Sequence, residues 1–107
     1  MSLLMVRFGA GRNIAKAGVY EIINVTTGDF YIGASKDVCT RMQQHINQLK
    51  RNEHICKSMQ LDWNKYGEYI FEFNVLEYCN ISELESKETK YIKSRKPFYN
   101  SKMYINR

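Results

Sequence analysis

Two strand-forming runs joined by a turn restrict how this chain can fold more than any other feature of its sequence. Residues 17–25 and 30–34 are rich in β-branched and aromatic side chains, and the segment Thr-Thr-Gly-Asp lies between them. Threonine, glycine and aspartate are typical of segments that reverse the chain direction. The pattern therefore predicts a β-hairpin, and we expect the other elements to support it.

The two faces of this hairpin differ in chemistry because side chains alternate along a strand. A loop of two or four residues predicts one register, in which Val25 pairs with Phe30. One face then carries the phenols of Tyr20 and Tyr31 beside the bare backbone of Gly33, which is typical of a reaction site. The other face is mostly apolar and is predicted to be the core layer; it carries Glu21, Ile23, Val25, Phe30 and Ile32.

Helices and a third strand are predicted after the hairpin. Apolar residues at helical spacing indicate helices over residues 38–50 and 55–66. Either Ser35 or Asp37 can cap the first of them. Alternating apolar and polar residues over 69–78 predict the third strand, so the elements together indicate an α+β fold.

The last predicted helix carries a carboxylate in an unusual place. A capping box of Ser82 and Glu85 opens the helix, which ends before Pro97 and is followed by an extended segment over residues 98–100. Glu88 falls within the apolar stripe of this helix. Because burial of an unpaired charge costs several kcal/mol, Glu88 is expected to be paired, hydrogen-bonded or bound to a cation.

Length and composition favour one small domain. The chain has 107 residues, of which 44% are hydrophobic and 25% charged, as in ordinary globular proteins. We expect a basic N-terminal arm over residues 1–16, one catalytic domain over 17–100 and a short basic tail over 101–107. The domain has room for one modest core and no separate recognition unit.

Charge and cysteine content indicate the surroundings in which the protein works. A formal net charge of +5 favours anionic partners, with nucleic acid ahead of an acidic protein or a membrane surface. Cys39, Cys56 and Cys79 are odd in number and widely spaced, which is typical of reduced thiols in the cytoplasm. No apolar run reaches membrane-spanning length, so we expect no membrane association.

The remaining unusual residues suit hydrolysis of a phosphodiester. Arg41 and His45 lie four residues apart on one predicted helix, so they share a side of it. A divalent cation held by Glu88 would polarise the phosphate, and Arg41 would stabilise the charge of the transition state. A phenol or an imidazole would activate water. One carboxylate indicates one metal ion, and Mg²⁺ (or Mn²⁺) fits because it keeps most of its water ligands.

Five elements in this order resemble the GIY-YIG endonuclease family. They are Gly18-Val19-Tyr20, Tyr31-Ile32-Gly33, the Arg41 and His45 helix, Glu88-x-x-Tyr91-Ile92, and Tyr99-Asn100. Valine stands at position 19, where isoleucine is usual in the family. The likeness extends over about residues 17–100 and is most similar to the catalytic domains of phage and intron homing endonucleases.

This resemblance implies a fold and a reaction. The fold is α+β, with a small three-stranded antiparallel sheet flanked by three or more helices. The reaction is metal-dependent cleavage of one DNA strand at each site, with one ion bound by Glu88. If the protein is encoded by a phage, it would act in the cytosol of the host cell.

The resemblance also implies roles for individual residues. Arg41 stabilises the phosphate, Tyr20 activates water, and Tyr31 and His45 assist by hydrogen bonding, although any of these last three could be the general base. Gly33 and Lys36 are expected at the DNA contact, with Gly33 allowing close backbone approach. Asn100 would orient its neighbours.

Other functions are compatible with the same residues. A restriction or repair nuclease could share the fold, and a non-catalytic DNA-binding module would use the basic surface without cutting. A small structural domain would use Glu88 only in packing. In the homing enzymes a recognition module follows a linker, so a separate recognition domain or protein partner is expected to supply specificity.

Overall fold

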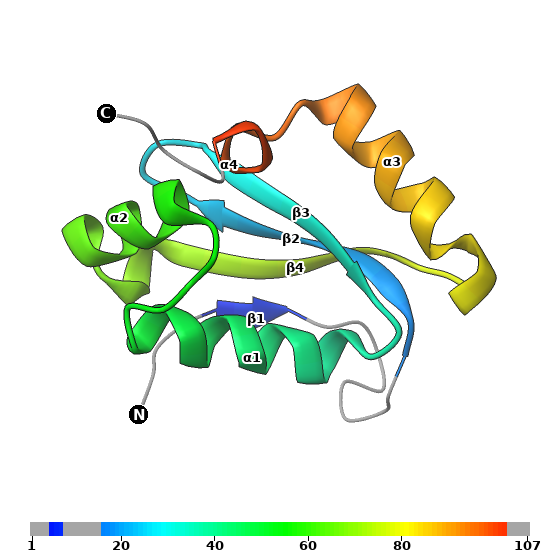
Figure 1. Ribbon diagram of the computed structural model, residues 1–107, viewed down its shortest axis with the longest axis horizontal. Helices are drawn as coiled ribbons and strands as arrows, with labels where there is room; N and C mark the ends of the chain where they lie inside the picture. Colours follow the sequence, from blue (N-terminus) through cyan, green and yellow to red (C-terminus); the bar gives the residue numbers. More distant parts are fainter. Residues whose placement is uncertain (1–4, 8–15, 103–107) are drawn as a thin grey trace.

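A sheet with the strand order β1-β4-β2-β3 organises the molecule in the computed structural model, which describes residues 5–7 and 16–102 (Figure 1). The strands are β1 (Met5–Arg7), β2 (Gly18–Asn24), β3 (Phe30–Ser35) and β4 (Phe71–Tyr78). The helices are α1 (Val38–Lys50), α2 (Lys57–Tyr66), α3 (Leu84–Arg95) and α4 (Phe98–Ser101), with short 3₁₀ turns η1 (Glu68–Ile70) and η2 (Ile81–Glu83).

The predicted α+β fold is confirmed, because β4, β2 and β3 form an antiparallel sheet flanked by helices. β1 adds a short strand parallel to β4. The rest of the arm predicted over residues 1–16 lies outside the described residues, except for position 16. Of the tail predicted over 101–107, only 101 and 102 are described.

The predicted hairpin is present, but its register was wrong by two residues on β2. Phe30 pairs with Ile23 rather than Val25, and Tyr20 pairs with Gly33. The side chain of Asn24 causes the difference, because its Oδ1 accepts hydrogen bonds from the Thr26 and Thr27 amides at 2.9 and 3.1 Å. This Asx turn ends β2 early and lengthens the loop. A shift of two residues preserves the faces, so Tyr20 and Gly33 still share one.

The predicted core face of the hairpin was only partly right, because Ile32 on that face is buried but the main core lies on the phenol-bearing face. Tyr20 and Ile22 are 1% and 0% exposed and belong to the main core, whereas Val25 on the opposite face is 51% exposed. Helix α1 covers the phenol-bearing face with the apolar stripe that its sequence predicted: Val38, Met42, Ile46 and Leu49 are all buried. A phenol can be buried when its hydroxyl is hydrogen-bonded, so the candidate reaction face is part of the core.

Of the first three helices, α1 begins as the sequence predicts, whereas the starts of α2 and α3 depart from the prediction. Asp37, one of the two predicted caps, accepts from the Thr40 amide at 3.1 Å and starts α1. Helix α2 begins at Lys57, leaving Ile55 half-exposed in the preceding loop. The capping box before α3 joins Asn80 and Glu83, two residues earlier than predicted, and so produces η2.

The segment predicted to be extended after Pro97 is the short helix α4. Tyr99 of this helix is fully buried. Its hydroxyl donates to Asp62 Oδ2 at 2.7 Å and accepts from Asn24 Nδ2 at 3.2 Å. These two bonds join α4 to α2 and to the end of β2, and they satisfy the phenol in the core.

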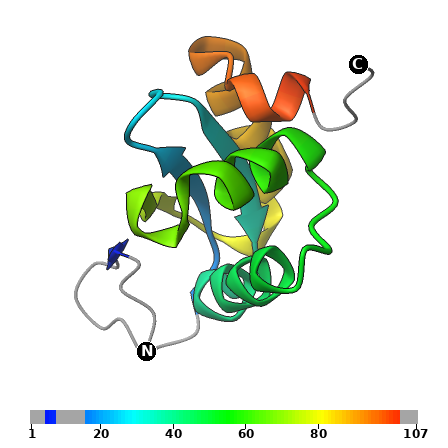
Figure 2. The same ribbon diagram turned by 90° about the vertical axis from the view of Figure 1, so that its left-hand side faces the viewer.

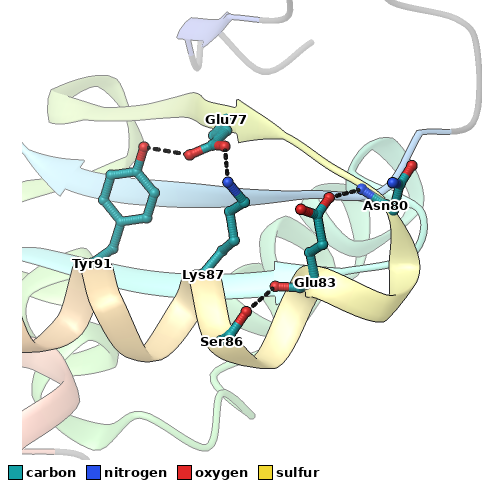
Figure 3. A network of polar contacts seen from close by, with 6 residues as sticks. All are labelled: Glu77, Asn80, Glu83, Ser86, Lys87 and Tyr91. Carbon is teal, nitrogen blue, oxygen red and sulfur yellow. Dashed lines mark hydrogen bonds and ion pairs between the residues drawn. The ribbon is translucent and has the colours of Figure 1, made fainter.

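Helix α3 packs against β3 and β2 with no fully buried residue. Figure 3 shows Lys87 and Tyr91 reaching from α3 to Glu77 on β4, at 2.6 and 3.0 Å. Arg95 lies 3.8 Å from Glu21 of β2. Exposed ion pairs contribute little to stability, so their main effect is to fix how α3 lies on the sheet. Across residues 5–7 and 16–102, none of the helices is long and apolar enough to cross a membrane.

Candidate active site

Tyr20 and His45 form the centre of the site. Tyr20 lies on β2 and His45 on α1, and the phenol oxygen is 2.6 Å from His45 Nε2. Both side chains are almost fully buried. The ring of Tyr31 on β3 lies edge-on to His45, with centroids 5.5 Å apart. The structure therefore brings together the three side chains that the sequence analysis considered as general bases.

His54 belongs to the same cluster, although the sequence analysis assigned it no role. It lies in the connection between α1 and α2, which can be followed in Figure 2. Its Nε2 is 2.7 Å from His45 Nδ1, and the two rings stack with centroids 4.9 Å apart. Nine residues separate the two histidines across an irregular loop, so no helical or strand periodicity could have predicted the contact.

Both histidines are neutral at physiological pH. Burial is the main cause and Arg41 the second: together they lower the pKa of His45 to about 2 and that of His54 to about 4. A neutral imidazole has one ring nitrogen that donates a hydrogen bond and one that accepts. The hydrogen bonds made by His45 and His54 must therefore all run in the same direction from one ring to the next.

The two phenols are protonated for the same physical reason. Burial raises the pKa of Tyr20 far above its ordinary value, and it raises the pKa of Tyr31 as well. The negative charge of Glu88 adds to both shifts, whereas the positive charge of Arg41 opposes them. The charges of Glu88 and Arg41 therefore both influence the pKa of the two phenols.

Arg41 is half-buried, one helical turn before His45 on α1. Its Nη1 donates to Gln44 Oε1 at 3.2 Å, which leaves other guanidinium hydrogens available. Its charge shifts the pKa of Tyr20, Tyr31 and both histidines. Arg41 is thus positioned beside the cluster, as the sequence predicted.

Gly33 is required by the position of the Tyr20 ring. A Cβ at residue 33 would lie 2.5 Å from the Tyr20 hydroxyl and 2.6 Å from Cζ of the same ring. Gly33 pairs directly with Tyr20 across the strands, and the ring lies over it. The close approach at this glycine therefore serves Tyr20; the predicted DNA contact at Gly33 stays a prediction.

Two further predicted site residues are Asn100, which bonds to the backbone of β3, and Lys36, which is exposed. Asn100 Oδ1 accepts from the Ile32 amide at 2.8 Å, and its Nδ2 donates to the Ile32 carbonyl at 2.9 Å. These two bonds attach Asn100 to β3 between Tyr31 and Gly33, and its predicted orienting role stays a prediction. Lys36 is exposed in the turn before α1, where a phosphate could reach it.

Glu88 offers a carboxylate suited to a hard cation. It is half-buried on α3, and burial, followed by the nearby charge of Glu85, raises its pKa. Within residues 16–102 no hydrogen bond or ion pair engages this carboxylate. The same residues contain no cluster of three or more His, Cys, Asp or Glu side chains able to hold a metal. The donor set fits an ion that takes one carboxylate and keeps its remaining waters, as Mg²⁺ does.

Comparison with known proteins gives consistent results. The GIY-YIG catalytic domain family matches residues 16–103. The chain is 34% identical over 62 residues to intron-associated endonuclease 1 of Enterobacteria phage T4, covering 58% of this chain and 25% of that protein. It is 32% identical over 84 residues to probable intron-encoded endonuclease 1 of Neurospora crassa, covering 72% of this chain and 26% of that protein. The chain thus spans about a quarter of the length of these relatives.

Among solved structures, the fold is similar to that of the catalytic domain of homing endonuclease I-TevI. The TM-score is 0.68 at 28% sequence identity, over 74% of this chain and 87% of that one. The similarity therefore covers most of both folds.

Proposed function

The chain belongs to the GIY-YIG family of catalytic domains, and from that premise we propose that it is the nuclease domain of a homing-type endonuclease that hydrolyses DNA phosphodiesters. The observation that carries this proposal is that one positively and one negatively charged side chain both shift the pKa of the two phenols. The charges of Arg41 on α1 and Glu88 on α3 both act on Tyr20 and Tyr31. A structural role alone would not require a carboxylate that lacks a partner among the described residues and whose charge acts on two phenols.

Arg41 has the charge and the geometry that a phosphoryl transition state needs. A guanidinium donates several hydrogen bonds in one plane, and the bond from Arg41 to Gln44 uses one of these donors. Pre-organised positive charge at the developing negative charge is usually the largest single contribution to such catalysis. Arg41 would therefore hold the scissile phosphate and stabilise its extra charge.

Glu88 would be the protein ligand of one divalent cation, Mg²⁺ or Mn²⁺. Such an ion, when bound, supplies Lewis-acid polarisation of the phosphate and charge stabilisation at the leaving oxygen. The half-buried carboxylate, its raised pKa and the lack of a partner within the described residues support this assignment.

Tyr20 would orient the attacking water, and once its own phenol proton has passed to solvent or to a phosphate oxygen, the phenolate would accept a proton from that water. Burial raises the pKa of the Tyr20 phenol, so the free site holds the proton, and Arg41 opposes this burial effect. The Tyr31 ring, like that of Tyr20, lies edge-on to His45, and Tyr31 would assist by orienting the phosphate or the water. Lys36, exposed before α1, would contact the DNA backbone.

The partner would be DNA, with specificity supplied by a separate recognition domain or protein. The net charge of +5 supports phosphate contact, and the relatives that the chain matches are about four times as long as the matched region. The three cysteines are thiols rather than disulfides in the structure, which supports action in the cytoplasm.

Nicking of supercoiled plasmid tests the proposed function. The chain should convert supercoiled to open-circular DNA with Mg²⁺ or Mn²⁺, and EDTA should stop the conversion. Fusion to a sequence-specific DNA-binding domain corrects for weak binding by the isolated domain. If the fusion binds its target but never cuts it with any divalent ion, the proposal is wrong and the chain is a DNA-binding module.

A further inference from the structure

One backbone amide determines which nitrogen of His54 carries a proton. The Cys56 N–H donates to His54 Nδ1 at 2.9 Å. A backbone amide can only donate, so His54 Nδ1 must be unprotonated. Since His54 is neutral, its single ring hydrogen lies on Nε2.

The position of the hydrogen on His54 determines which nitrogen of His45 carries a hydrogen. His54 Nε2 faces His45 Nδ1 at 2.7 Å, so the hydrogen on the first nitrogen is donated to the second. His45 Nδ1 is then an acceptor, and the hydrogen of neutral His45 must lie on Nε2. That nitrogen is 2.6 Å from the phenol oxygen of Tyr20, so His45 donates to Tyr20.

We propose that His54 is a positioning residue that fixes His45 as the tautomer donating to Tyr20, which excludes His45 as the general base of the resting site. The bond between His45 and Tyr20 then stabilises the phenolate whenever the phenol loses its proton. The hydroxyl hydrogen of Tyr20 points away from His45 and is available to another acceptor. The kinetic part of this inference rests on the proposed nuclease function, whereas the tautomer assignment does not.

The loop around His54 is held rigidly enough to impose this order. His54 and Gln60 are 0% and 4% exposed. Gln60 Oε1 accepts from the His54 amide at 3.1 Å, and Gln60 Nε2 donates to the Leu49 carbonyl at 3.0 Å at the end of α1. These bonds connect both helices through Gln60, so the His54 ring is fixed relative to His45.

Nitrogen NMR of the ring atoms tests the tautomers without any catalytic assay. Long-range ¹H–¹⁵N spectra distinguish protonated from unprotonated ring nitrogens at neutral pH. We expect both His45 and His54 to carry hydrogen on Nε2 alone. A His45 protonated on Nδ1, or on both nitrogens, would overturn the inference even if the protein cuts DNA.

Two variants of equal size separate positioning from packing. His54→Gln keeps a side chain that can donate to His45 Nδ1, whereas His54→Glu presents an acceptor that favours hydrogen on Nδ1. We expect His54→Gln to keep the His45 tautomer and a cleavage rate at saturating DNA within about tenfold of wild type. His54→Glu should move the hydrogen to Nδ1 and slow cleavage by about 10²-fold or more.

Equal rate losses in the two folded variants, with the His45 tautomer unchanged, would contradict the positioning role. Thermal unfolding of each variant establishes that it is folded before rates are compared, and the wild-type spectrum decides alone if either variant unfolds. If wild type itself never nicks DNA, the proposed function fails, while the NMR result still decides the tautomer assignment.

Discussion

The phenol oxygen of Tyr20 lies 2.6 Å from Nε2 of His45, inside the core that joins β2 to α1. The candidate catalytic side chains are therefore also packing residues. A substitution here can reduce activity by removing a chemical group or by loosening the fold. A matched control variant or a separate stability measurement distinguishes the two effects.

Gly33→Ala should impair the site by displacing Tyr20. The added methyl would lie 2.5 Å from the hydroxyl, so the ring must move away from His45. We expect a loss of about 1–3 kcal/mol in the free energy of unfolding, with a fall in nicking rate larger than destabilisation explains. Urea unfolding and single-turnover nicking measure the two quantities.

Gly18→Ala is the matched control, because a methyl there would meet the Glu77 carbonyl at 2.6 Å and the backbone of Tyr78 rather than Tyr20. It should destabilise the sheet and leave the cleavage rate of the folded fraction close to wild type. Equal effects of the two substitutions on that rate would show that the close approach at Gly33 has no connection with Tyr20.

Tyr20→Phe should be far more damaging than Tyr31→Phe. The first removes the hydroxyl next to His45 and leaves a buried donor unpaired, which costs about 1–3 kcal/mol of stability. If Tyr20 accepts the proton of water, the cleavage rate of the Tyr20→Phe variant should fall by about 10²-fold or more. Similar cleavage rates for the two variants would indicate that a group other than Tyr20 accepts the proton of water.

Arg41→Ala should reduce the rate of cleavage by about 10²–10³-fold with the fold intact, because pre-organised charge at the transition state is lost. Arg41→Lys should recover part of that loss, since it retains the charge without the planar donors. Gln44→Ala, which removes the partner of Arg41, serves as the control. Wild-type cleavage by the Arg41→Ala variant would refute the assigned role.

The stability of the fold should decrease as pH falls below the ordinary histidine range. Burial, with Arg41, lowers the pKa of His45 to about 2 and of His54 to about 4, both below the value of 6.5. Between pH 6.5 and 4 the unfolded chain binds protons that the folded protein does not, so the stabilisation present above pH 6.5 is lost on acidification. Each histidine contributes a slope approaching about 1.4 kcal/mol per pH unit.

Denaturant unfolding of wild type and His54→Gln over this pH range checks that prediction. The variant lacks one of the two groups, so its free energy of unfolding should change less steeply with pH. Superimposable pH dependences would indicate that His54 titrates normally in the folded protein.

The order of elements could be predicted from sequence because each has a local signal. Alternation identified the hairpin and β4, and the buried stripe of α1 followed from helical spacing. Arg41 and Glu88 were also predictable, since charged residues beside or within an apolar stripe stand out. The hairpin register was not, because the Asn24 side chain ends β2 through bonds that a strand pattern does not reveal.

The core face and the role of His54 depend on tertiary contacts and could not be predicted in this way. A tyrosine reads as a surface or a core residue depending on whether its hydroxyl finds a partner, and Tyr20 finds one on a helix 25 residues away in sequence. His54 reaches His45 only because Gln60 holds the loop between α1 and α2. Such long-range hydrogen bonds leave no periodic signal.

Comparison of Glu88→Gln with Glu85→Gln in one plasmid assay tests the central claim most directly. Both residues are glutamates on α3, and the charge of Glu85 acts on Glu88, but only Glu88 is half-buried with its charge acting on the phenols. We predict that Glu88→Gln binds DNA as wild type does and shows no Mg²⁺-dependent nicking, while Glu85→Gln nicks at close to the wild-type rate. Metal-dependent nicking by Glu88→Gln at the wild-type rate would contradict the account.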